Sequence, residues 1–401
     1  MEMDVVLFDS YESRMHLMPL VTNKPIAMLR VGALCIKEKW ALSFAGDVHL
    51  SLSTHPSLQA KYPNASLKTD SVLCVDAAIC PDKKIMEALE GLRNGECLRD
   101  GDGQWMAFRV EGQHFKFEEP QIMDYTEIHY GDEYIRIRYF EDLLRYNSGQ
   151  LISDIALLGI KKHTSPLSSS NIILGDNLIL SNDVYAEAST FNTLAGPIYI
   201  SDGAVIEEGS HLRGPLYIGE NSVVKMGSMV YGNVSIGPNC TVGGEIKNSI
   251  ILANSNKGHE GYLGSSLIGE YCNIGAGTNV SNLQNTYSEL KLYDYRLNEY
   301  RQTQEYKFGV VMGDYTMCGV NTSFTTGSVI GIGVQLAKTH IIDKWVPDFT
   351  WQTDRKNETY RWDGFVKMLR NKFIKEQKSF KKIDQDFLQE IYNNCTLKNK
   401  N

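Results

Sequence analysis

Residues 200–242 read ISDGAV IEEGSH LRGPLY IGENSV VKMGSM VYGNVS IGPNCT V, with an aliphatic residue at the start of every group of six. The step begins at Leu194 and returns, with apolar residues, over 268–280 and 312–342. Neither an α-helix, with 3.6 residues per turn, nor an ordinary strand, with a period of two, produces this spacing. A hexapeptide repeat does, because every sixth side chain of a three-sided coil points inward. The pattern predicts a left-handed parallel β-helix in the C-terminal half.

The rest of the chain is organised around this repeat. Residues 1–150 carry apolar strand patterns at 5–8 and 71–75 and helical spacing at 84–92, which together predict a compact α/β domain. We expect a linker at 151–170, coils at 171–343 and a tail at 344–401 that contains an amphipathic helix pair. A polar, tyrosine-rich insertion at 283–307 interrupts the period. We interpret it as an intersubunit or active-site arm, since loops on a rigid solenoid often carry function. The alternative interpretation is a surface loop that only covers the β-helix.

Composition excludes several classes of protein. The 401 residues carry a net charge of −8, so no basic footprint for nucleic acid is present. The acidic N-terminus does not read as a secretory signal, and no apolar run approaches the roughly 18 residues that a membrane span needs. The eight cysteines are scattered without a Cys-x-x-Cys pair, which argues against disulfides and zinc. We therefore expect a cytoplasmic protein that binds neither nucleic acid nor membrane.

Residues 245–264 form the segment that is most informative about chemistry. They read EIKNSIILANSNKGHEGYLG and are followed by NIGAGT at 273–278 and by SN at 281–282. This order resembles the acetyltransferase half of the bifunctional N-acetylglucosamine-1-phosphate uridylyltransferase/glucosamine-1-phosphate acetyltransferase. It is also similar to the archaeal two-domain sugar-1-phosphate nucleotidylyltransferases. In the bifunctional family a Lys-Ala-Gly-His-Leu-x-Tyr-Leu-Gly-Asp segment precedes Asn-Ile-Gly-Ala-Gly-Thr and a downstream asparagine.

The resemblance implies roles for five residues. His259 falls on the catalytic histidine, Tyr262 on a substrate-contacting tyrosine, and Lys247 on a lysine that binds the sugar phosphate. Asn273 and Asn282 fall on asparagines that position the sugar and the acetyl donor. These residue types suit the reaction, because a neutral imidazole with a pKa of about 6.5 can take the proton of an attacking amine. The alternatives are a histidine that only forms hydrogen bonds at a coil corner, and an asparagine ladder that includes Asn273.

The segment also departs from the family. Ser265 replaces the aspartate after Tyr-Leu-Gly, and Leu283 replaces a tyrosine that follows the second asparagine. Met229 aligns with a phosphate-binding arginine, and Arg213 aligns poorly as a substitute for it. These differences bear on the identity of the acceptor and on acetyl transfer itself.

The N-terminal region resembles the opening of sugar nucleotidyltransferases. Residues 5–9, VVLFD, lead to Arg14, to Pro-Leu at 19–20 and to Lys24 before a proline. The resemblance implies that Arg14 and Lys24 bind nucleotide. Residues 9–13, DSYES, replace the family's Gly-rich turn, and their two acidic side chains disfavour phosphate. Asp76 and Asn147 are candidate ligands for Mg²⁺, although Asp76 also fits a turn at the end of a strand.

The whole pattern is similar to a GlmU-like group of sugar nucleotidyltransferases. The resemblance implies a homotrimeric sugar-phosphate transferase that moves an acetyl group from acetyl-CoA to an amino-sugar phosphate. Nucleotidyl transfer in the N-domain, with Mg²⁺, is a further possibility that the altered turn weakens. The alternative is a non-catalytic nucleotide-sugar-binding or scaffold protein. A carbonic-anhydrase-like metal site is disfavoured, because His211, His259 and His340 are too widely spaced to be brought together with confidence.

Overall fold

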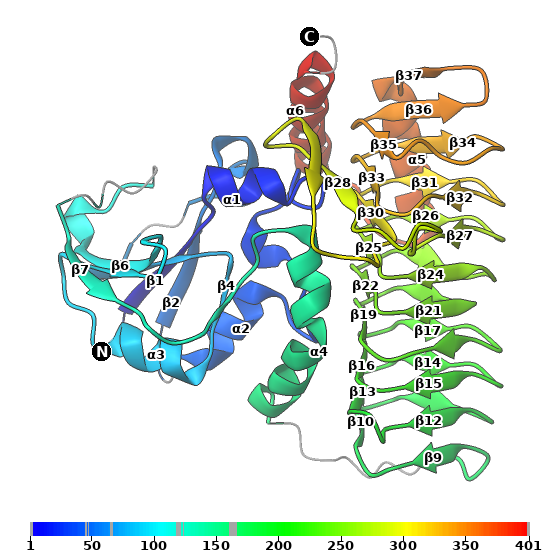
Figure 1. Cartoon of the computed structure of the whole chain (residues 1–401), viewed down its shortest axis with the longest axis horizontal. Coiled ribbons are helices and arrows are strands. Elements are labelled where there is room, and N and C mark those ends of the chain that lie inside the picture. The colour runs from blue at the N-terminus through cyan, green and yellow to red at the C-terminus, as the bar shows by residue number, and fades with distance from the viewer. Residues whose placement is uncertain are drawn as a thin grey trace.

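The structure is a computed structural model that describes residues 3–44, 46, 48–64, 67–117, 122, 124–159 and 167–398. An α/β domain lies beside a tall parallel β-helix, and two helices near the C-terminus pack at the upper end of the β-helix (Figure 1). No helix in the described part of the chain combines the length and apolar character that crossing a bilayer requires. The predicted fold class is confirmed.

The N-domain contains a mixed six-stranded sheet. The strands β2, β1 and β3 run parallel, β6 is antiparallel to β3, and the strand order is β2-β1-β3-β6-β5-β7. The two predicted strands and the predicted helix at 84–92 are β1, β3 and α3. The strands are β1 (Met3–Phe8), β2 (Val48–Ser53), β3 (Ser71–Asp76), β4 (Ile79–Cys80), β5 (Glu96–Arg99), β6 (Trp105–Glu111), β7 (Thr126–His129) and β8 (Ile135–Arg136). The helices are α1 (Tyr11–His16), α2 (Ile36–Ser43), α3 (Lys83–Glu90) and α4 (Phe140–Leu157).

The β-helix has three faces of stacked parallel strands. Face one contains β10 (Leu178–Leu180), β13 (Ile198–Ile200), β16 (Leu216–Ile218), β19 (Val234–Ile236), β22 (Ile250–Ile251), β25 (Leu267–Ile268), β30 (Val310–Met312), β33 (Ser328–Ile330) and β35 (Trp345–Val346). Face two contains β11 (Tyr185–Ala186), β14 (Val205–Ile206), β17 (Val223–Val224), β20 (Thr241–Val242), β23 (Asn256–Lys257), β26 (Asn273–Ile274), β31 (Met317–Cys318), β34 (Gln335–Ala337), β36 (Thr350–Thr353) and the antiparallel β37 (Asn357–Thr359). Face three contains β9 (Ile172–Leu174), β12 (Thr190–Asn192), β15 (His211–Arg213), β18 (Met229–Val230), β21 (Glu245–Lys247) and β24 (Tyr262–Gly264), followed by the pair β27 (Asn279–Val280) and β32 (Ser323–Phe324).

The residues of the six-residue step fill the interior of the β-helix. From Ile200 to Val242, and again at 268–280 and 312–342, these side chains are buried in one continuous core. Leu194 is the exception, because its side chain is 74% exposed. Thr190 pairs with His211, 21 positions further on, whereas regular coils such as Ile198 to Leu216 advance by 18. The extra residues form an outward turn, and this turn carries Leu194 out of the core.

The structure moves two predicted boundaries. A helix and a loop were expected at 151–170, but the helix there is the end of α4, which begins at Phe140 and continues to Leu157, so the boundary expected after residue 150 falls within one helix. Residues 160–166 of this stretch lie outside the described residues. The coils continue beyond residue 343, because β35 pairs with β33 and β36 pairs with β34. The predicted helix pair follows as α5 (Trp362–Lys375) and α6 (Lys382–Lys398). Its apolar side packs on aromatic corner residues of the upper coils, including Tyr315 and Phe349.

The insertion at 283–307 is an antiparallel hairpin that joins the two halves of the chain. Its strands are β28 (Lys291–Asp294) and β29 (Glu299–Gln302), and a bridge between Leu283 and Lys307 closes its base. Leu290 and Leu292 are buried in the same core as Leu7 of the N-domain and Val311 of the β-helix. The two halves therefore share one apolar core.

Candidate functional site

Three of the five residues assigned to acetyl transfer lie together on face three. Strand β24 pairs with β21, which places Tyr262 opposite Glu245 and Lys247 opposite Gly264. The amide Nδ2 of Asn282 donates to the Tyr262 hydroxyl at 3.2 Å. Burial and the nearby charge of Glu245 raise the pKa of Tyr262, so its hydroxyl stays protonated and able to donate.

Lys247 projects from the same face into solvent. Its Nζ lies 5.6 Å from the centre of the Tyr231 ring, in the coil below. A lysine in this position offers a mobile positive charge that a phosphate can approach from outside the prism.

His259 stands at the turn between face two and face three. We call residues 258–261 the His259 corner; it connects β23 to β24 and leads directly into Tyr262. The His259 side chain is exposed in the single chain, so the imidazole is neither sealed inside the prism nor used in its core. Its place beside the face that carries Lys247, Tyr262 and Asn282 fits the predicted role of a base.

Asn273 lies apart from this group. It is on β26 of face two, and its Oδ1 accepts a hydrogen bond from Nδ2 of Asn256 at 2.9 Å in the coil below. This contact is the asparagine ladder that was the alternative interpretation of Asn273. Asn273 lines a cavity of about 800 Å³ together with Lys372 and Lys375 of α5, and Tyr262 is not among the residues that line it.

Arg14 lies on α1, and its buried side chain is bonded within its own domain. Its Nη1 bonds Asp9 Oδ2 at 3.0 Å and the carbonyl of Lys24 at 2.9 Å, while Nη2 bonds the carbonyls of Val21 and Thr22. Asp9 therefore neutralises the cation that was expected to bind nucleotide. Residues 9–13 form the start of α1 and its cap, and Asp9 and Arg14 make an internal ion pair there.

Lys24 joins the two domains. Its Nζ lies 2.8 Å from Glu270 Oε1 and 2.8 Å from Asp314 Oδ2, both on the β-helix, and its side chain is only 2% exposed. Burial alone would lower the pKa of Lys24, but the charges of Asp314 and Glu270 outweigh it and raise this pKa. The ammonium stays charged and is enclosed by two carboxylates of the β-helix.

Asp76 and Asn147 do not form a pair. Asp76 accepts from the Ala78 N–H at 2.9 Å and lies 3.6 Å from Arg136 Nε. Asn147, on α4, is fully buried; its Oδ1 accepts from the Gly32 N–H and from Ser235, and its Nδ2 donates to Asn233. Its amide therefore fastens the N-domain to the β-helix. These residues do not fit a Mg²⁺ site, since one oxygen donor is paired with an arginine and the other is used between the domains.

No three His, Cys, Asp or Glu side chains gather as metal ligands within the described ranges. The histidines at 211, 259 and 340 accordingly form no such group there.

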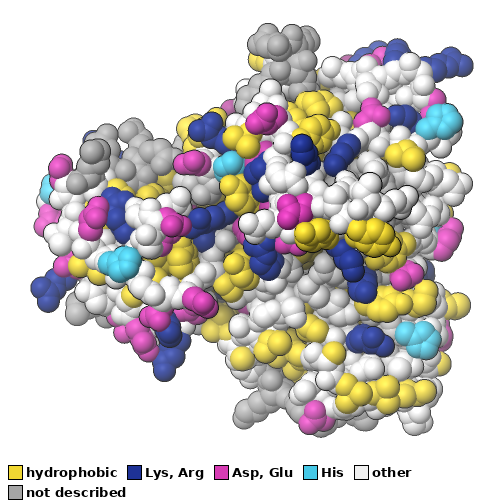
Figure 2. Space-filling model, in the orientation of Figure 1, with side chains coloured by type: hydrophobic (Ala, Val, Ile, Leu, Met, Phe, Trp, Pro, Cys, Tyr) yellow, Lys and Arg dark blue, Asp and Glu magenta, His cyan; other side chains and the backbone are white. Residues whose placement is uncertain are grey.

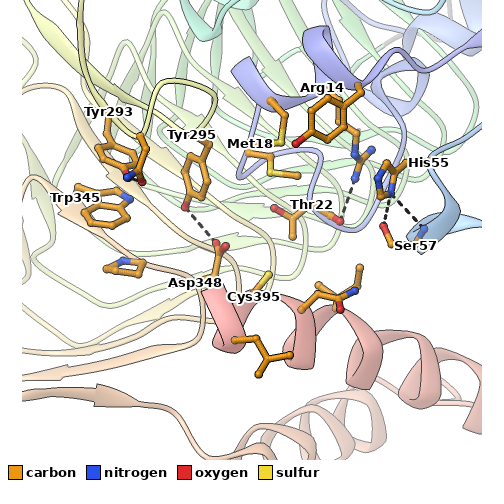
Figure 3. Close-up of a pocket in the computed structure, with 17 residues that line it drawn as sticks. Arg14, Met18, Thr22, His55, Ser57, Tyr293, Tyr295, Trp345, Asp348 and Cys395 are labelled. Carbon is orange, nitrogen blue, oxygen red and sulfur yellow. Dashed lines mark hydrogen bonds between the residues drawn. The ribbon is translucent and has the colours of Figure 1, made fainter. Parts of the chain in front are cut away.

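A cavity of about 710 Å³ lies where the carboxyl ends of β1 and β2 meet the β-helix (Figure 3). Tyr11 and Arg14 follow β1, and His55 and Ser57 follow β2. Ligands of open α/β sheets bind beyond the carboxyl ends of parallel strands, so this is the position expected for a substrate of the N-domain.

The far wall of this cavity comes from distant segments of the chain. The ring of Tyr293, in the hairpin, stacks on Trp345 of the β-helix with 4.0 Å between ring centres. Tyr295 donates to Asp348 Oδ1 at 3.2 Å, and Ile391 contributes from α6 (Figure 3). The sequence patterns did not predict this wall, because nothing in a linear order shows that the insertion and the tail meet α1.

Two family models match the chain. Residues 5–162 match the model of the sugar nucleotidyl transferases, and residues 212–346 match that of the GMPPB C-terminal domain. The resemblance stated from the motifs is thereby confirmed for both halves. The first match covers the N-domain sheet and α4, and the second covers most of the coils, including the His259 corner.

Curated relatives agree with these matches. The chain is 32% identical over 117 residues to the bifunctional protein GlmU of Methanocaldococcus jannaschii, covering 29% of this chain and 28% of that protein. It is 36% identical over 180 residues to the GlmU of Methanococcus maripaludis, covering 44% and 42%. It is 34% identical over 89 residues to a bifunctional sugar-1-phosphate nucleotidylyltransferase/acetyltransferase of Sulfurisphaera tokodaii, covering 22% and 21%. The matched stretches thus span less than half of the length of these relatives.

Proposed function

We propose that this protein is a sugar-phosphate transferase of the GlmU-like group. Its β-helix would transfer an acetyl group from acetyl-CoA to the amine of an amino-sugar phosphate. The observation that carries this proposal is that Lys247, Tyr262 and Asn282 share one face, and that the exposed His259 lies on the corner leading into that face.

Each residue has a part in this reaction. The amine nitrogen attacks the thioester carbonyl, a C–N bond forms and the C–S bond breaks. His259 takes the proton that the amine loses and returns it to the departing thiolate. Lys247 attracts the phosphate, and the hydroxyl of Tyr262 and the amide of Asn282 hold the sugar by hydrogen bonds.

The active form that we propose is a homotrimer. Met226 and Val320 are each 68% exposed, and both lie on the turns between face two and face three, two coils below and two coils above His259. Hydrophobic side chains are also exposed in the lower coils, where Ile172 is 57% exposed and Met229 42% (Figure 2). A second copy packed along this edge would cover these side chains and enclose His259 in a cleft.

The reaction is assigned to the cytoplasm. Seven cysteines, all except Cys395, are buried free thiols, as a reducing compartment favours. Acetyl-CoA and sugar phosphates are the cosubstrates that this assignment implies.

The N-domain is proposed to bind a nucleotide or sugar phosphate in the 710 Å³ cavity and to transfer nucleotidyl groups weakly. Arg14 and Lys24 are held in internal ion pairs, and Asp76 and Asn147 do not fit Mg²⁺. The cavity keeps rings that can stack on a base, such as Tyr293 and Trp345. Binding without catalysis in this half is the alternative.

Release of thiol from acetyl-CoA in the presence of glucosamine-1-phosphate tests the proposal. His259→Ala is expected to lower kcat by about 10²–10⁴, the usual contribution of a general base. The control is His340→Ala, an exposed histidine elsewhere in the coils, which should keep wild-type turnover. Unchanged turnover in His259→Ala would remove this histidine from the mechanism.

Release of pyrophosphate from UTP or dTTP with a panel of sugar phosphates tests the N-domain, with and without added Mg²⁺. We expect little or no release, and calorimetric titration of the same nucleotides should still detect binding. Strong release that Asp76→Ala abolishes would show instead that this half is a competent nucleotidyltransferase.

A further inference from the structure

A lysine occupies the interior of the β-helix directly beneath the His259 corner. Lys257 pairs with Val242 of the coil below, and both side chains point into the prism. The next strand of face two carries the buried Ile274. Lys257 is only 2% exposed, although lysine is almost never fully buried without a partner.

The ammonium of Lys257 is held by backbone carbonyls. Its Nζ donates to the carbonyl oxygens of His259 at 2.6 Å, Gly243 at 3.1 Å and Glu260 at 3.4 Å. The three N–H donors of a lysine therefore meet three acceptors from two successive corners. Two of those acceptors belong to the His259 corner itself.

The environment of this amine combines burial with nearby ionisable groups. Desolvation lowers the pKa of Lys257 to about 8, and the charge of Glu260 on the same corner and of Cys318 on β31 act in the opposite direction. Lys225, in the coil below, directs its own Nζ to Glu207. The charged amine can donate to all three carbonyls, and the neutral amine, which has two N–H groups, can still donate to two of them.

The His259 corner is also confined by close packing. Gly261 has a φ of +115°, and a Cβ at this position would lie 2.0 Å from the carbonyl oxygen of Thr278 in the coil above. A Cβ on Gly258 would lie 2.8 Å from Oδ1 of Asn256. Packing thus restrains the corner from one side, and the Lys257 amine restrains it from inside the prism.

We infer that Lys257 is a positioning residue for His259: from inside the prism, it holds the turn that carries the exposed imidazole and leads into the strand of Tyr262. This inference rests on the proposed function, in which His259 is the base. Lys257 itself does not contact the reacting atoms, because its amine is enclosed by the carbonyls. A general base that is moved out of hydrogen-bonding distance of the proton it abstracts loses much of its effect on the reaction rate.

Lys257→Met tests the inference, since methionine fills a similar volume but cannot donate to the carbonyls. We expect kcat for acetyl transfer to fall at least tenfold, while KM for both substrates stays within about twofold. In a His259→Ala background the same substitution should cause no further loss, because Lys257 acts through His259. The matched control is Val224→Ala, a buried residue of the same interior face two coils below, which weakens the prism without touching the corner.

Hydrogen exchange supplies a readout that does not depend on activity. Amides 258–261 should exchange at least tenfold faster in Lys257→Met than in the wild type, and Val224→Ala should leave them unchanged. An active wild type with full kcat in Lys257→Met, or unchanged exchange at these amides, would overturn the inference. If the wild type transfers no acetyl group, the proposed function fails, and the exchange rates alone decide whether Lys257 holds the corner.

Discussion

Lys24 forms a buried ion-pair contact between the two domains. Replacing it with methionine leaves Asp314, which is 0% exposed, in the interface without its cation. We expect Lys24→Met to lower the free energy of unfolding by about 3–5 kcal/mol, the usual effect of removing one partner from a buried ion pair. Urea denaturation measures this difference.

The control for this experiment is Lys83→Met on α3. The Lys83 side chain is 91% exposed and lies 3.8 Å from Glu87, so its loss should change stability by less than about 0.5 kcal/mol. Equal effects of the two substitutions would show that the Lys24 cluster does not hold the domains together.

The lowered pKa of Lys257 should make the stability of the protein depend on pH. Its pKa is about 8 in the folded protein and 10.5 for an ordinary lysine, so between these values the unfolded chain binds more protons. The stability contributed by this residue therefore rises with pH from about 8 to 10.5, by about 3 kcal/mol at most, and is constant below that window. The difference in Tm between the wild type and Lys257→Met should shift in favour of the wild type as pH rises. A difference that stays flat across this range would contradict the lowered pKa.

At the scale of elements, the β28–β29 hairpin is the arm that connects the halves. Arg301 Nη2 contacts Glu141 Oε1 at 2.8 Å and Oε2 at 3.0 Å, and the guanidinium lies 3.8 Å from the centre of the Tyr139 ring. Burial raises the pKa of Glu141, and Arg301 opposes this effect. Arg301→Ala should destabilise the protein by about 2–3 kcal/mol and speed hydrogen exchange at 291–302.

Arg296→Ala is the matched control for the arm, because Arg296 is exposed on the turn of the same hairpin. It should leave both stability and exchange near wild-type values. If Arg301→Ala behaves in the same way, the ion pair with Glu141 does not anchor the arm.

At the scale of the whole molecule, the exposed edge beside His259 predicts the oligomeric state. Sedimentation equilibrium of the wild type should give the mass of three chains. The double variant Met226→Glu/Val320→Glu should give the mass of one chain and lose acetyl transfer, because charges on this edge oppose association and each cleft loses its second wall.

Ile374→Glu controls for an exposed apolar residue elsewhere, since Ile374 is 74% exposed on α5. It should remain trimeric and active. A wild type that sediments as a single chain would end the proposal of a shared cleft.

The candidate sites show which contacts the spacing of sequence motifs can predict. Tyr262 and Asn282 were assigned together, and they meet at 3.2 Å because both follow the regular advance of the coils. Asn273 was assigned with them but lies on another face. Arg14 and Lys24 keep the positions of a nucleotide motif, but Asp9, Asp314 and Glu270 take up their charges. Asp9 is only five residues from Arg14, but Glu270 and Asp314 lie in the other half of the chain from Lys24, and motif order does not reveal partners at that distance.

The amino-acid pattern alone was sufficient to predict which side chains fill the interior of the β-helix, because a six-residue period is local and each coil repeats the same burial. It was not sufficient for Leu194, where three extra residues turn the chain outward. Folding in three dimensions decided the domain interface and the cavity between α1 and the hairpin. Each of these depends on which distant segments come into contact, and the free energy of burying a charge is set by those contacts and not by its neighbours in sequence.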